Sequence, residues 1–297
     1  MQNPMIQKLA RWADLSSDDI AALRKITDAG HSVERGTHLI REGDDPEAVF
    51  LLLEGWAYRY KMLGNGKRRI VAILLPGDLC DTHIFVLDQM DHGIAMLSPG
   101  RVVAIPRLTM LDVIDHHPTI AKALWWATLV DEAVLREWLA NIGGREAYSR
   151  IAHFLCELAK RLESVGLFQS GGFDMPMNQI ELGDALGLTA VHVNRVLRRL
   201  RQNGLVNTSR QRITIPDFSG LCILGDFDPS YLHARQQPNA WRLASSAPPC
   251  PATTRVICVI ATTPDEPLER IIGAVADRLE PIVRRSTRVA HSSGFLL

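Results

Sequence analysis

Residues Met177–Ile215 read MNQIELGDALGLTAVHVNRVLRRLRQNGLVNTSRQRITI and hold the strongest local pattern in the chain. Asn178 followed by Glu181 three residues later is a capping-box start for a helix, and Gly187 can adopt the positive φ of a helix end. Thr189 is suited to cap a second helix. The spacing therefore predicts two short helices joined by a tight turn, the arrangement called a helix-turn-helix.

The second predicted helix has two chemically different faces. Its apolar residues recur at helical spacing and form an inward face of Val193, Val196, Leu197 and Leu200. The segment from residue 187 to residue 216 contains six arginines and no acidic residue. A surface of one sign of charge matches a groove lined by phosphates, although a solvated basic face on an ordinary helical pair is the alternative.

A short hairpin is predicted after the second helix. Apolar runs at 205–207 and 213–215 flank a polar segment, which places Arg210 and Arg212 near the hairpin tip. This is the pattern of a wing. Because helix pair, charge and wing agree, we predict that residues 143–217 form a winged helix-turn-helix that binds double-stranded DNA.

The overall composition is that of a soluble globular protein. The chain has 297 residues, 46% of them hydrophobic and 22% charged, enough for about two domains. The net charge is zero but unevenly distributed: residues 1–142 carry 15 basic and 19 acidic side chains, whereas residues 143–217 carry 10 and 7. The basic excess thus coincides with the predicted DNA-binding domain.

Cysteine usage and hydropathy indicate the compartment. The five cysteines show no CxxC or other clustered spacing, and the amino-terminal segment lacks the apolar core of an export signal. An odd number of cysteines without such a signal predicts reduced thiols and a cytoplasmic protein. No apolar run reaches the roughly 18 residues of a membrane span, so we expect no membrane association.

The amino-terminal half predicts a helical segment followed by a sheet. Residues 4–30 have helical spacing with a capped start at Ser16 or Ser17. Short alternating segments then follow between turn residues, among them Gly64-Asn65-Gly66, which predicts a tight hairpin turn. They predict an antiparallel β-roll of the jelly-roll or double-stranded β-helix type. The predicted strands are Thr37–Arg41, Ala48–Leu53, Ala57–Leu63, Arg69–Leu75 and Val102–Pro106.

Helical spacing returns after the roll. Leu108–Ile114 predicts a short helix, and Thr119–Ile142 predicts a long helix that is apolar on more than one face. Such a helix must bury both sides. A second copy of the same helix is the simplest partner, so we predict a homodimer; burial within a single domain is the alternative. Arg145–Val165 predicts a further amphipathic helix.

The chain is therefore predicted to be an α+β protein of four segments. These are a sensor roll in residues 1–117, a long dimerisation helix in 118–142, the winged helix-turn-helix in 143–217 and an extension in 218–297. Gly143-Gly144 is the predicted hinge. Much of the extension is rich in Pro, Ala and Ser, and we expect it to be partly disordered, with one helix near its end.

A roll, a long helix, a glycine hinge and a winged helix-turn-helix in this order resemble the Crp/Fnr superfamily of bacterial transcription regulators. The resemblance covers about residues 5–235. It is carried by RGTHLIREGDDPEAVFLLLEGWAYRYKMLGNGKRRIVAILLPGDL in the roll and by LGDALGLTAVHVNRVLRRLRQNGLV in the helix-turn-helix, which we call the reader. It implies a sequence-specific transcription regulator that binds a pseudo-palindromic DNA site as a homodimer and either recruits or obstructs RNA polymerase.

The resemblance also indicates where relatives bind cyclic nucleotides. Those relatives place a Gly-Glu pair soon after the Gly-Asp turn, and an Arg-Ser pair some ten residues later. Here Asp81 precedes Thr82 at the first place, and His92 is the only base near the second. An acid facing the phosphate would repel it, so we expect no cyclic AMP binding through these contacts. The candidate effector pocket, for an unknown effector and with no cofactor or metal expected, consists of Gly77, Asp78, Thr82, His83, Asp91 and His92.

The family includes two other sensing chemistries. Its oxygen-sensing members hold an iron–sulfur centre with an amino-terminal cysteine cluster, and such a centre needs about four thiolates. No cysteine precedes Cys80 here, so we do not expect an iron–sulfur centre. A haem-sensing branch places a Cys and a His close to the positions of Cys80 and His83, so haem- or thiol-based redox or gas sensing through these two residues is the alternative function. Packed or surface positions are the simpler interpretation of a lone Cys and His.

The resemblance further implies which residues contact DNA. Thr189 begins the recognition helix, and the following positions meet base edges. Ala190 and Val191 can touch a thymine methyl group, whereas Asn194 can contact adenine and Arg195 guanine. Phosphate contacts are predicted for a second group, and Asn178 completes the predicted DNA-binding set. The phosphate-contacting group is His192, Arg198, Arg199, Arg210 and Arg212.

Competing functions find less support in the residues. There is no GxSxG, P-loop or HExxH motif and no pair of carboxylates at a catalytic spacing, so we do not predict an enzyme. A ligand-gated module with a vestigial reader is a third hypothesis. The intact arginine face argues against it.

Overall fold

The computed structural model describes residues 3–81 and 88–233. They belong to a compact unit, Met1–Arg242, and the remaining residues of the chain form a second unit, Leu243–Leu297. The predicted linker and helix of the extension lie outside the described residues.

Two helices rather than one form the start of the chain. Helix α1 (Pro4–Leu9) is capped by the Asn3 side chain. Helix α2 (Ser17–Thr27) begins with a capping box, in which Ser16 and Asp19 bond each other's backbone N–H groups. The predicted capped start at Ser16 is confirmed, and the helical spacing of residues 4–30 is interrupted between the two helices.

The predicted antiparallel roll is confirmed. Its strands pair in two four-stranded antiparallel sheets, with the orders β1-β8-β3-β6 and β2-β7-β4-β5. The hairpin between β4 and β5 has its predicted turn, with Gly66 at φ 76°. The strands are β1 (His31–Val33), β2 (His38–Ile40), β3 (Ala48–Glu54), β4 (Ala57–Met62), β5 (Arg68–Leu74), β6 (Leu79–Cys80), β7 (Gly93–Met96) and β8 (Gly100–Pro106).

Sequence patterning missed three of these strands for identifiable reasons. Strands β1 and β6 are only three and two residues long. Strand β7 is buried at all four positions, so it lacks the apolar–polar alternation on which strand prediction relies.

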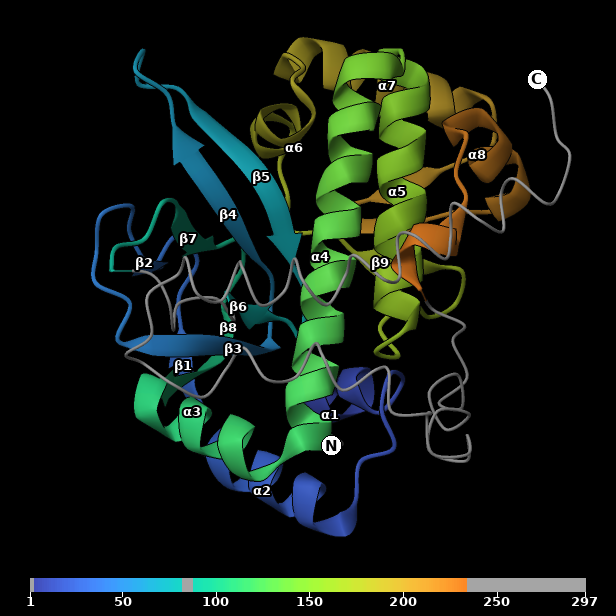
Figure 1. The fold of residues 1–297 in the computed structure, drawn as a ribbon. Coiled ribbons are helices and arrows are strands. Elements are labelled where there is room, and N and C mark those ends of the chain that lie inside the picture. Colours follow the sequence, from blue (N-terminus) through green and yellow to red (C-terminus); the bar gives the residue numbers. More distant parts are fainter. Residues whose placement is uncertain (1–2, 82–87, 234–297) are drawn as a thin grey trace, which may run out of the picture. The chain divides into compact units, whose positions relative to one another are not determined.

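Three helices follow the roll: α3 (Arg107–His116), α4 (Pro118–Gly144) and α5 (Ala147–Glu163). The hinge predicted at Gly143-Gly144 stays a prediction, but helix α4 continues through both glycines, past its predicted end at Ile142, and the chain turns at Arg145-Glu146. The reason is local: the Arg145 N–H still donates to the Asn141 carbonyl at 3.3 Å, which closes the last helical turn. Figure 1 shows α4 beside α5.

The DNA-binding domain contains the predicted helix pair and wing. The helices are α6 (Gln179–Leu186) and α7 (Ala190–Gln202), and the wing is the hairpin of β10 (Asn207–Ser209) and β11 (Arg212–Thr214). A third strand, β9 (Gly172–Asp174), pairs with β11 and was not predicted. Helix α8 (Phe218–Gly225) and the short 3₁₀ helix η2 (Pro229–Leu232) follow.

Apolar packing joins the DNA-binding domain to one sheet of the roll. One core cluster contains Trp56 and Ile73 of the roll together with Phe154 of α5 and Leu182 of α6. The rings of Trp56 and Phe173 stack at 6.4 Å between centroids. Figure 1 accordingly shows the β4–β5 hairpin reaching toward α6. A second cluster lies between the sheets of the roll and helices α1 to α4.

Candidate nucleic-acid interface

The start of α6 is fixed by the predicted capping box. The Asn178 side-chain oxygen accepts hydrogen bonds from the N–H groups of Ile180 and Glu181, both at 2.9 Å. The Glu181 carboxylate accepts in return from the Asn178 N–H at 2.8 Å. Asn178 is exposed but its side-chain oxygen is occupied within the helix start, so its predicted contact with DNA stays a prediction.

Two glycines set the corner between α6 and α7. Gly187 ends α6 at φ 66°, as predicted from its position. A Cβ at Gly183 would lie 2.4 Å from the carbonyl oxygen of Leu188, a separation that no side chain tolerates. A glycine is therefore required at residue 183 for the turn to pass close over α6.

Helix α7 separates its apolar and basic residues as predicted. The Thr189 side chain accepts from the His192 N–H, which caps the helix, and the four predicted inward residues are buried. On the opposite face Val191 is 81% exposed. The other exposed side chains on this face are Asn194, Arg195, Arg198, Arg199 and Arg201.

The arginines of this domain differ in how far the protein already engages them. Within residues 3–81 and 88–233, Arg195, Arg198 and Arg210 make no ion pair or hydrogen bond through their side chains. The Arg199 guanidinium lies 4.2 Å from the centre of the Tyr148 ring. The Arg212 guanidinium pairs with Asp174 at 3.2 Å, so its predicted phosphate contact must compete with an internal acid.

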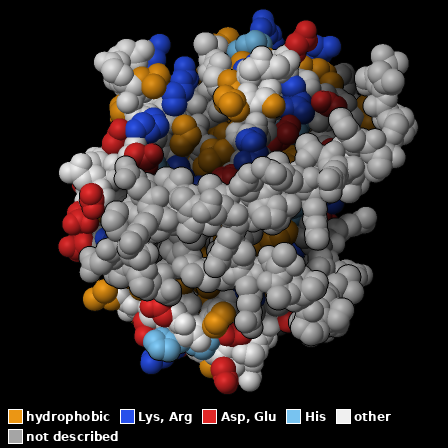
Figure 2. All heavy atoms as spheres, in the orientation of Figure 1, with side chains coloured by type: hydrophobic (Ala, Val, Ile, Leu, Met, Phe, Trp, Pro, Cys, Tyr) orange, Lys and Arg blue, Asp and Glu red, His pale blue; other side chains and the backbone are white. Residues whose placement is uncertain are grey.

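The surface around α7 is concave and basic. A groove of about 720 Å³ runs between α6, α7 and the wing, and Gln179 and Thr208 line it although sequence reasoning did not select them. Asn194 donates to Gln179 across this groove at 3.3 Å. Figure 2 shows Lys and Arg side chains gathered over α6, α7 and the β4–β5 hairpin. The sequence feature that could have identified Gln179 is its position in the first turn of α6, directly after the cap residue Asn178.

The described residues of the predicted effector pocket make two sets of contacts, and the pocket itself stays a prediction. Gly77, at φ 90°, and Asp78 form a tight turn, and the Asp78 carboxylate accepts from Lys8, from Arg161 at 3.3 Å and from the Leu75 N–H at 2.7 Å. Asp78 therefore holds the fold together at this turn. Thr82 and His83 lie outside the described residues.

Asp91 and His92 belong to a separate charged cluster in the roll. His92 contacts Asp91 and, through Nε2, lies 2.7 Å from Asp81, whose carboxylate also lies 3.0 Å from Arg59. Arg59 reaches Asp131 of α4 at 3.2 Å. Burial alone would lower the pKa of Arg59, but the carboxylates of Asp81 and Asp131 outweigh burial and raise it. Arg59, a buried cation, is thus neutralised by the protein's own acids.

The alternative based on Cys80 and His83 gains no support from the geometry. Cys80 is buried, and burial raises the pKa of its thiol well above the ordinary value, which disfavours the thiolate needed for metal binding or oxidation. His83 is not among the described residues. In the part of the chain that the structure describes, no group of three His, Cys, Asp or Glu side chains is arranged to hold a metal ion.

Comparison with known proteins matches two domain families to this chain. Residues 31–117 match the cyclic nucleotide-binding domain family, and residues 149–224 match the Crp-like helix-turn-helix domain. The chain is 29% identical over 212 residues to the transcriptional activator protein FnrA of Stutzerimonas stutzeri, covering 71% of this chain and 86% of that protein. It is 28% identical over 182 residues to the nitrogen fixation regulation protein FixK of Azorhizobium caulinodans, covering 60% and 73%.

A solved structure supports the fold. FixK2 from Bradyrhizobium japonicum superposes with a TM-score of 0.60 at 24% identity, covering 66% of this chain and 96% of that one. No helix among the described residues is long and apolar enough to cross a bilayer. Two domains match in the predicted order, helix α7 presents an exposed basic face, and the relatives are regulators. The chain therefore belongs to the Crp/Fnr family of transcription regulators.

Proposed function

We propose that the protein is a cytoplasmic homodimer that binds a pseudo-palindromic DNA site through α7 and the wing and thereby controls access of RNA polymerase. The observation that carries the proposal is a set of exposed arginines that find no side-chain partner among the described residues: Arg195, Arg198 and Arg210. Several like charges on one face repel one another, and the phosphates of a DNA backbone relieve this repulsion.

The contacts divide into base reading and positioning. Val191, Asn194 and Arg195 lie on the exposed face near the amino-terminal end of α7, where recognition helices meet base edges. Val191 offers only an apolar contact, so discrimination depends on Asn194 and Arg195. Arg198 and Arg210 are placed to meet phosphates.

The proposed dimer uses the uncovered side of α4. This helix buries Ile120, Val134 and Trp138 against the rest of its own chain. At 100° per residue its exposed apolar side chains fall within an arc of about 140° on the other side. They are Trp125, Leu129, Leu135, Leu139 and Ile142. A second copy of α4 would cover this stripe and set two α7 helices on successive turns of DNA.

The roll is proposed to regulate without the cyclic-nucleotide contacts of its relatives. Asp81 and Asp131 already neutralise Arg59, so a cyclic phosphate would have to displace a carboxylate from a buried ion pair. Nothing in this proposal requires catalysis, and we place the protein among regulators rather than enzymes.

Fluorescence anisotropy of the full-length protein with labelled duplexes tests the DNA-binding proposal. Half-site spacings around one helical turn, about 10 base pairs, should bind best, and log affinity should fall linearly with log salt. The double variant Arg195→Ala/Arg198→Ala should lose most binding. The matched control is Arg24→Ala, an exposed arginine on α2. No salt-dependent binding to any duplex would refute the proposal.

Sedimentation tests the dimer separately. Leu139→Glu places a charge in the exposed stripe, where Leu139 is 75% exposed, and should produce monomers. Leu108→Glu on α3, where the leucine is 79% exposed, is the control and should remain dimeric. A wild-type protein that is monomeric at all concentrations would exclude this arrangement.

A further inference from the structure

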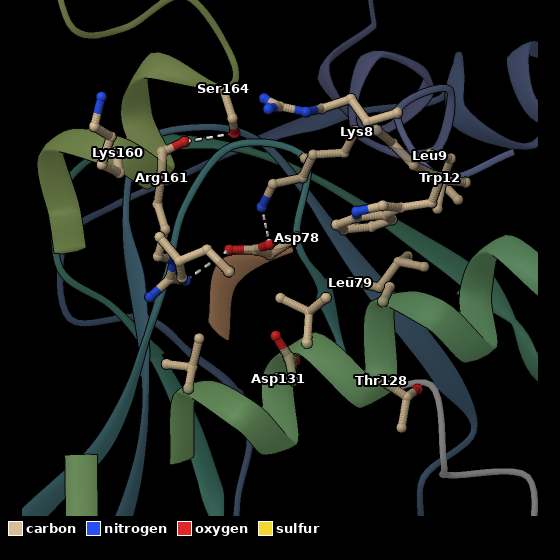
Figure 3. Close-up of a pocket in the computed structure, with 17 residues that line it drawn as sticks. Lys8, Leu9, Trp12, Asp78, Leu79, Thr128, Asp131, Lys160, Arg161 and Ser164 are labelled. Carbon is tan, nitrogen blue, oxygen red and sulfur yellow. Dashed lines mark hydrogen bonds and ion pairs between the residues drawn. The ribbon is translucent and has the colours of Figure 1, made fainter. Parts of the chain in front are cut away.

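A cavity of about 80 Å³ lies where α1, the Gly77-Asp78 turn, α4 and α5 meet (Figure 3). It is separate from the DNA-facing surface of α7. A water molecule needs about 10–15 Å³ by this kind of measure, so the cavity corresponds to roughly six waters or to a molecule of about six non-hydrogen atoms.

Most of the wall is apolar and comes from three parts of the chain. Side chains of α1 and of the residues just after it face strand β6 and helix α4 across the space. These apolar side chains are Met5, Leu9, Trp12, Leu79, Val130 and Val134. A wall of this kind favours a ligand with an apolar body.

One end of the cavity is polar, and Figure 3 shows Lys8, Asp78 and Arg161 converging there. Arg161 donates to three acceptors: Asp78, Glu157 at 3.2 Å and the Ile73 carbonyl at 2.7 Å. Lys8 differs: an ammonium carries three donors, and among the described residues only Asp78 accepts from it. The Lys8 side chain is 13% exposed, so solvent has little access to the donors that remain.

A second donor faces the same space. The Trp12 indole nitrogen is buried, and no acceptor within the described ranges lies at hydrogen-bond distance from it. Figure 3 shows the Trp12 ring beside Lys8 and Asp78. A buried donor without an acceptor is rare in folded proteins and calls for an explanation, such as an acceptor supplied from outside the chain.

The charge of the wall indicates an anionic acceptor. Four basic side chains line the cavity, from Lys8, Arg11, Lys160 and Arg161, against the two carboxylates of Asp78 and Asp131. Figure 3 shows the Lys160 ammonium directed away from the centre, whereas the Lys8 ammonium is directed toward Asp78. A carboxylate has two oxygens and can accept from an ammonium and an indole N–H together.

We propose that this cavity binds a small monocarboxylic acid with a short apolar chain, its carboxylate held by Lys8 Nζ and the Trp12 indole N–H. The apolar chain lies against Leu9, Leu79 and Val134. Arg161 of α5 donates to two acceptors in the roll, the Ile73 carbonyl and the Asp78 carboxylate. The ligand therefore sits where the DNA-binding domain contacts the roll. Any effect of the acid on DNA affinity rests on the proposed function, whereas its binding does not.

The test follows the indole N–H signals of the full-length, nitrogen-15-labelled protein while butanoate is added at constant pH and ionic strength. The chain has six tryptophans, and the Trp12 signal is the one lost in Trp12→Phe. We expect a saturable shift of the Trp12 signal with a dissociation constant roughly in the millimolar range, as befits a six-atom ligand. Butan-1-ol, similar in shape but uncharged, should bind at least about tenfold more weakly.

Two variants separate recognition from packing. Lys8→Met keeps the apolar stem and should weaken butanoate binding by about tenfold or more, whereas Lys25→Met, at an exposed lysine on α2, should leave it unchanged. If Lys8→Met does not fold, Trp12→Phe, measured by saturation transfer to the ligand, should still show weaker binding. Equal binding of butanol and butanoate, or a Trp12 signal that does not move while others do, would overturn the proposal. If the full-length protein binds no DNA but its Trp12 signal still shifts with butanoate, the result counts against the proposed function alone.

Discussion

Two arginines of α7 and two of the roll lie in opposite environments. Arg195 and Arg198 are exposed and, within the described residues, unpaired, whereas Arg59 is buried between Asp81 and Asp131, and Arg68 pairs with Asp184 at 2.8 Å. The same side chain therefore maintains structure in one region and is available to an external anion in the other. What differs is whether the chain supplies the carboxylate, and this difference can be tested one arginine at a time.

The largest effect is expected for Arg59→Met. Removing the guanidinium takes the arginine partner away from the buried Asp81 carboxylate, and breaking a buried pair in this way costs about 3–5 kcal/mol of unfolding free energy. Urea denaturation measures it. The matched variant Arg198→Met should change stability by less than about 0.5 kcal/mol, since that side chain is exposed. Similar losses in both variants would erase the contrast between the two regions.

A smaller effect, on DNA rather than stability, is expected for Arg195→Ala. Loss of a bidentate contact with guanine should cost about 1–3 kcal/mol of discrimination at one base pair in each half-site. Arg199→Ala should instead weaken all sequences alike, because its guanidinium lies on the Tyr148 ring and is placed to meet a phosphate. Binding titrations over base-substituted sites distinguish the two patterns. Equal, sequence-independent losses would contradict this division.

The wing should contribute through charge alone. Arg210→Ala should weaken binding to all duplexes and reduce the slope of log affinity against log salt by about 1, the change expected for one phosphate contact. Arg212→Ala should have a smaller effect on the slope, because Arg212 is already paired with Asp174. A larger change for Arg212 than for Arg210 would mean that the internal pair opens on DNA.

The smallest effect concerns pH. Burial lowers the pKa of His92, but hydrogen bonding and charge from Asp81 outweigh it and hold the pKa above the ordinary 6.5. The folded state thus favours protonated His92, and the resulting stabilisation is complete below about pH 6.5 and lost as pH rises through the raised pKa. The stability difference between wild type and His92→Gln should therefore shrink from about pH 6 to pH 8 in urea unfolding. A difference that grows with pH would contradict the assignment.

Local patterns were sufficient to predict the reader. The caps at Asn178 and Thr189, the turn at Gly187 and the apolar face of α7 each depend on residues within four positions of one another. Helical geometry alone relates such residues, so spacing in the sequence carries the information. The exposed basic face follows from the same periodicity.

Long-range pairs could not be predicted in this way. Arg212 meets Asp174 only because β9 and β11 pair in one register, and nothing near the three-residue strand β9 indicates that register. Asp78 shows the same limit, because α1 and α5 supply the cations that neutralise it from distant parts of the chain. Helix α4 runs past its predicted end at Ile142 because two glycines weaken a helix without having to end it.

The carboxylate of Glu181 takes part in two structures at once. One oxygen closes the capping box of α6, and the other pairs with Arg35 of the roll at 2.6 Å. Arg35 also donates to the carbonyls of Leu97 and Pro176, so its position is fixed from both sides. Rotation of the reader away from the roll must consequently give up this ion pair, and with it part of the restraint on the first turn of α6. Repositioning of the domain and fraying of the first turn of α6 are thereby made thermodynamically dependent on each other.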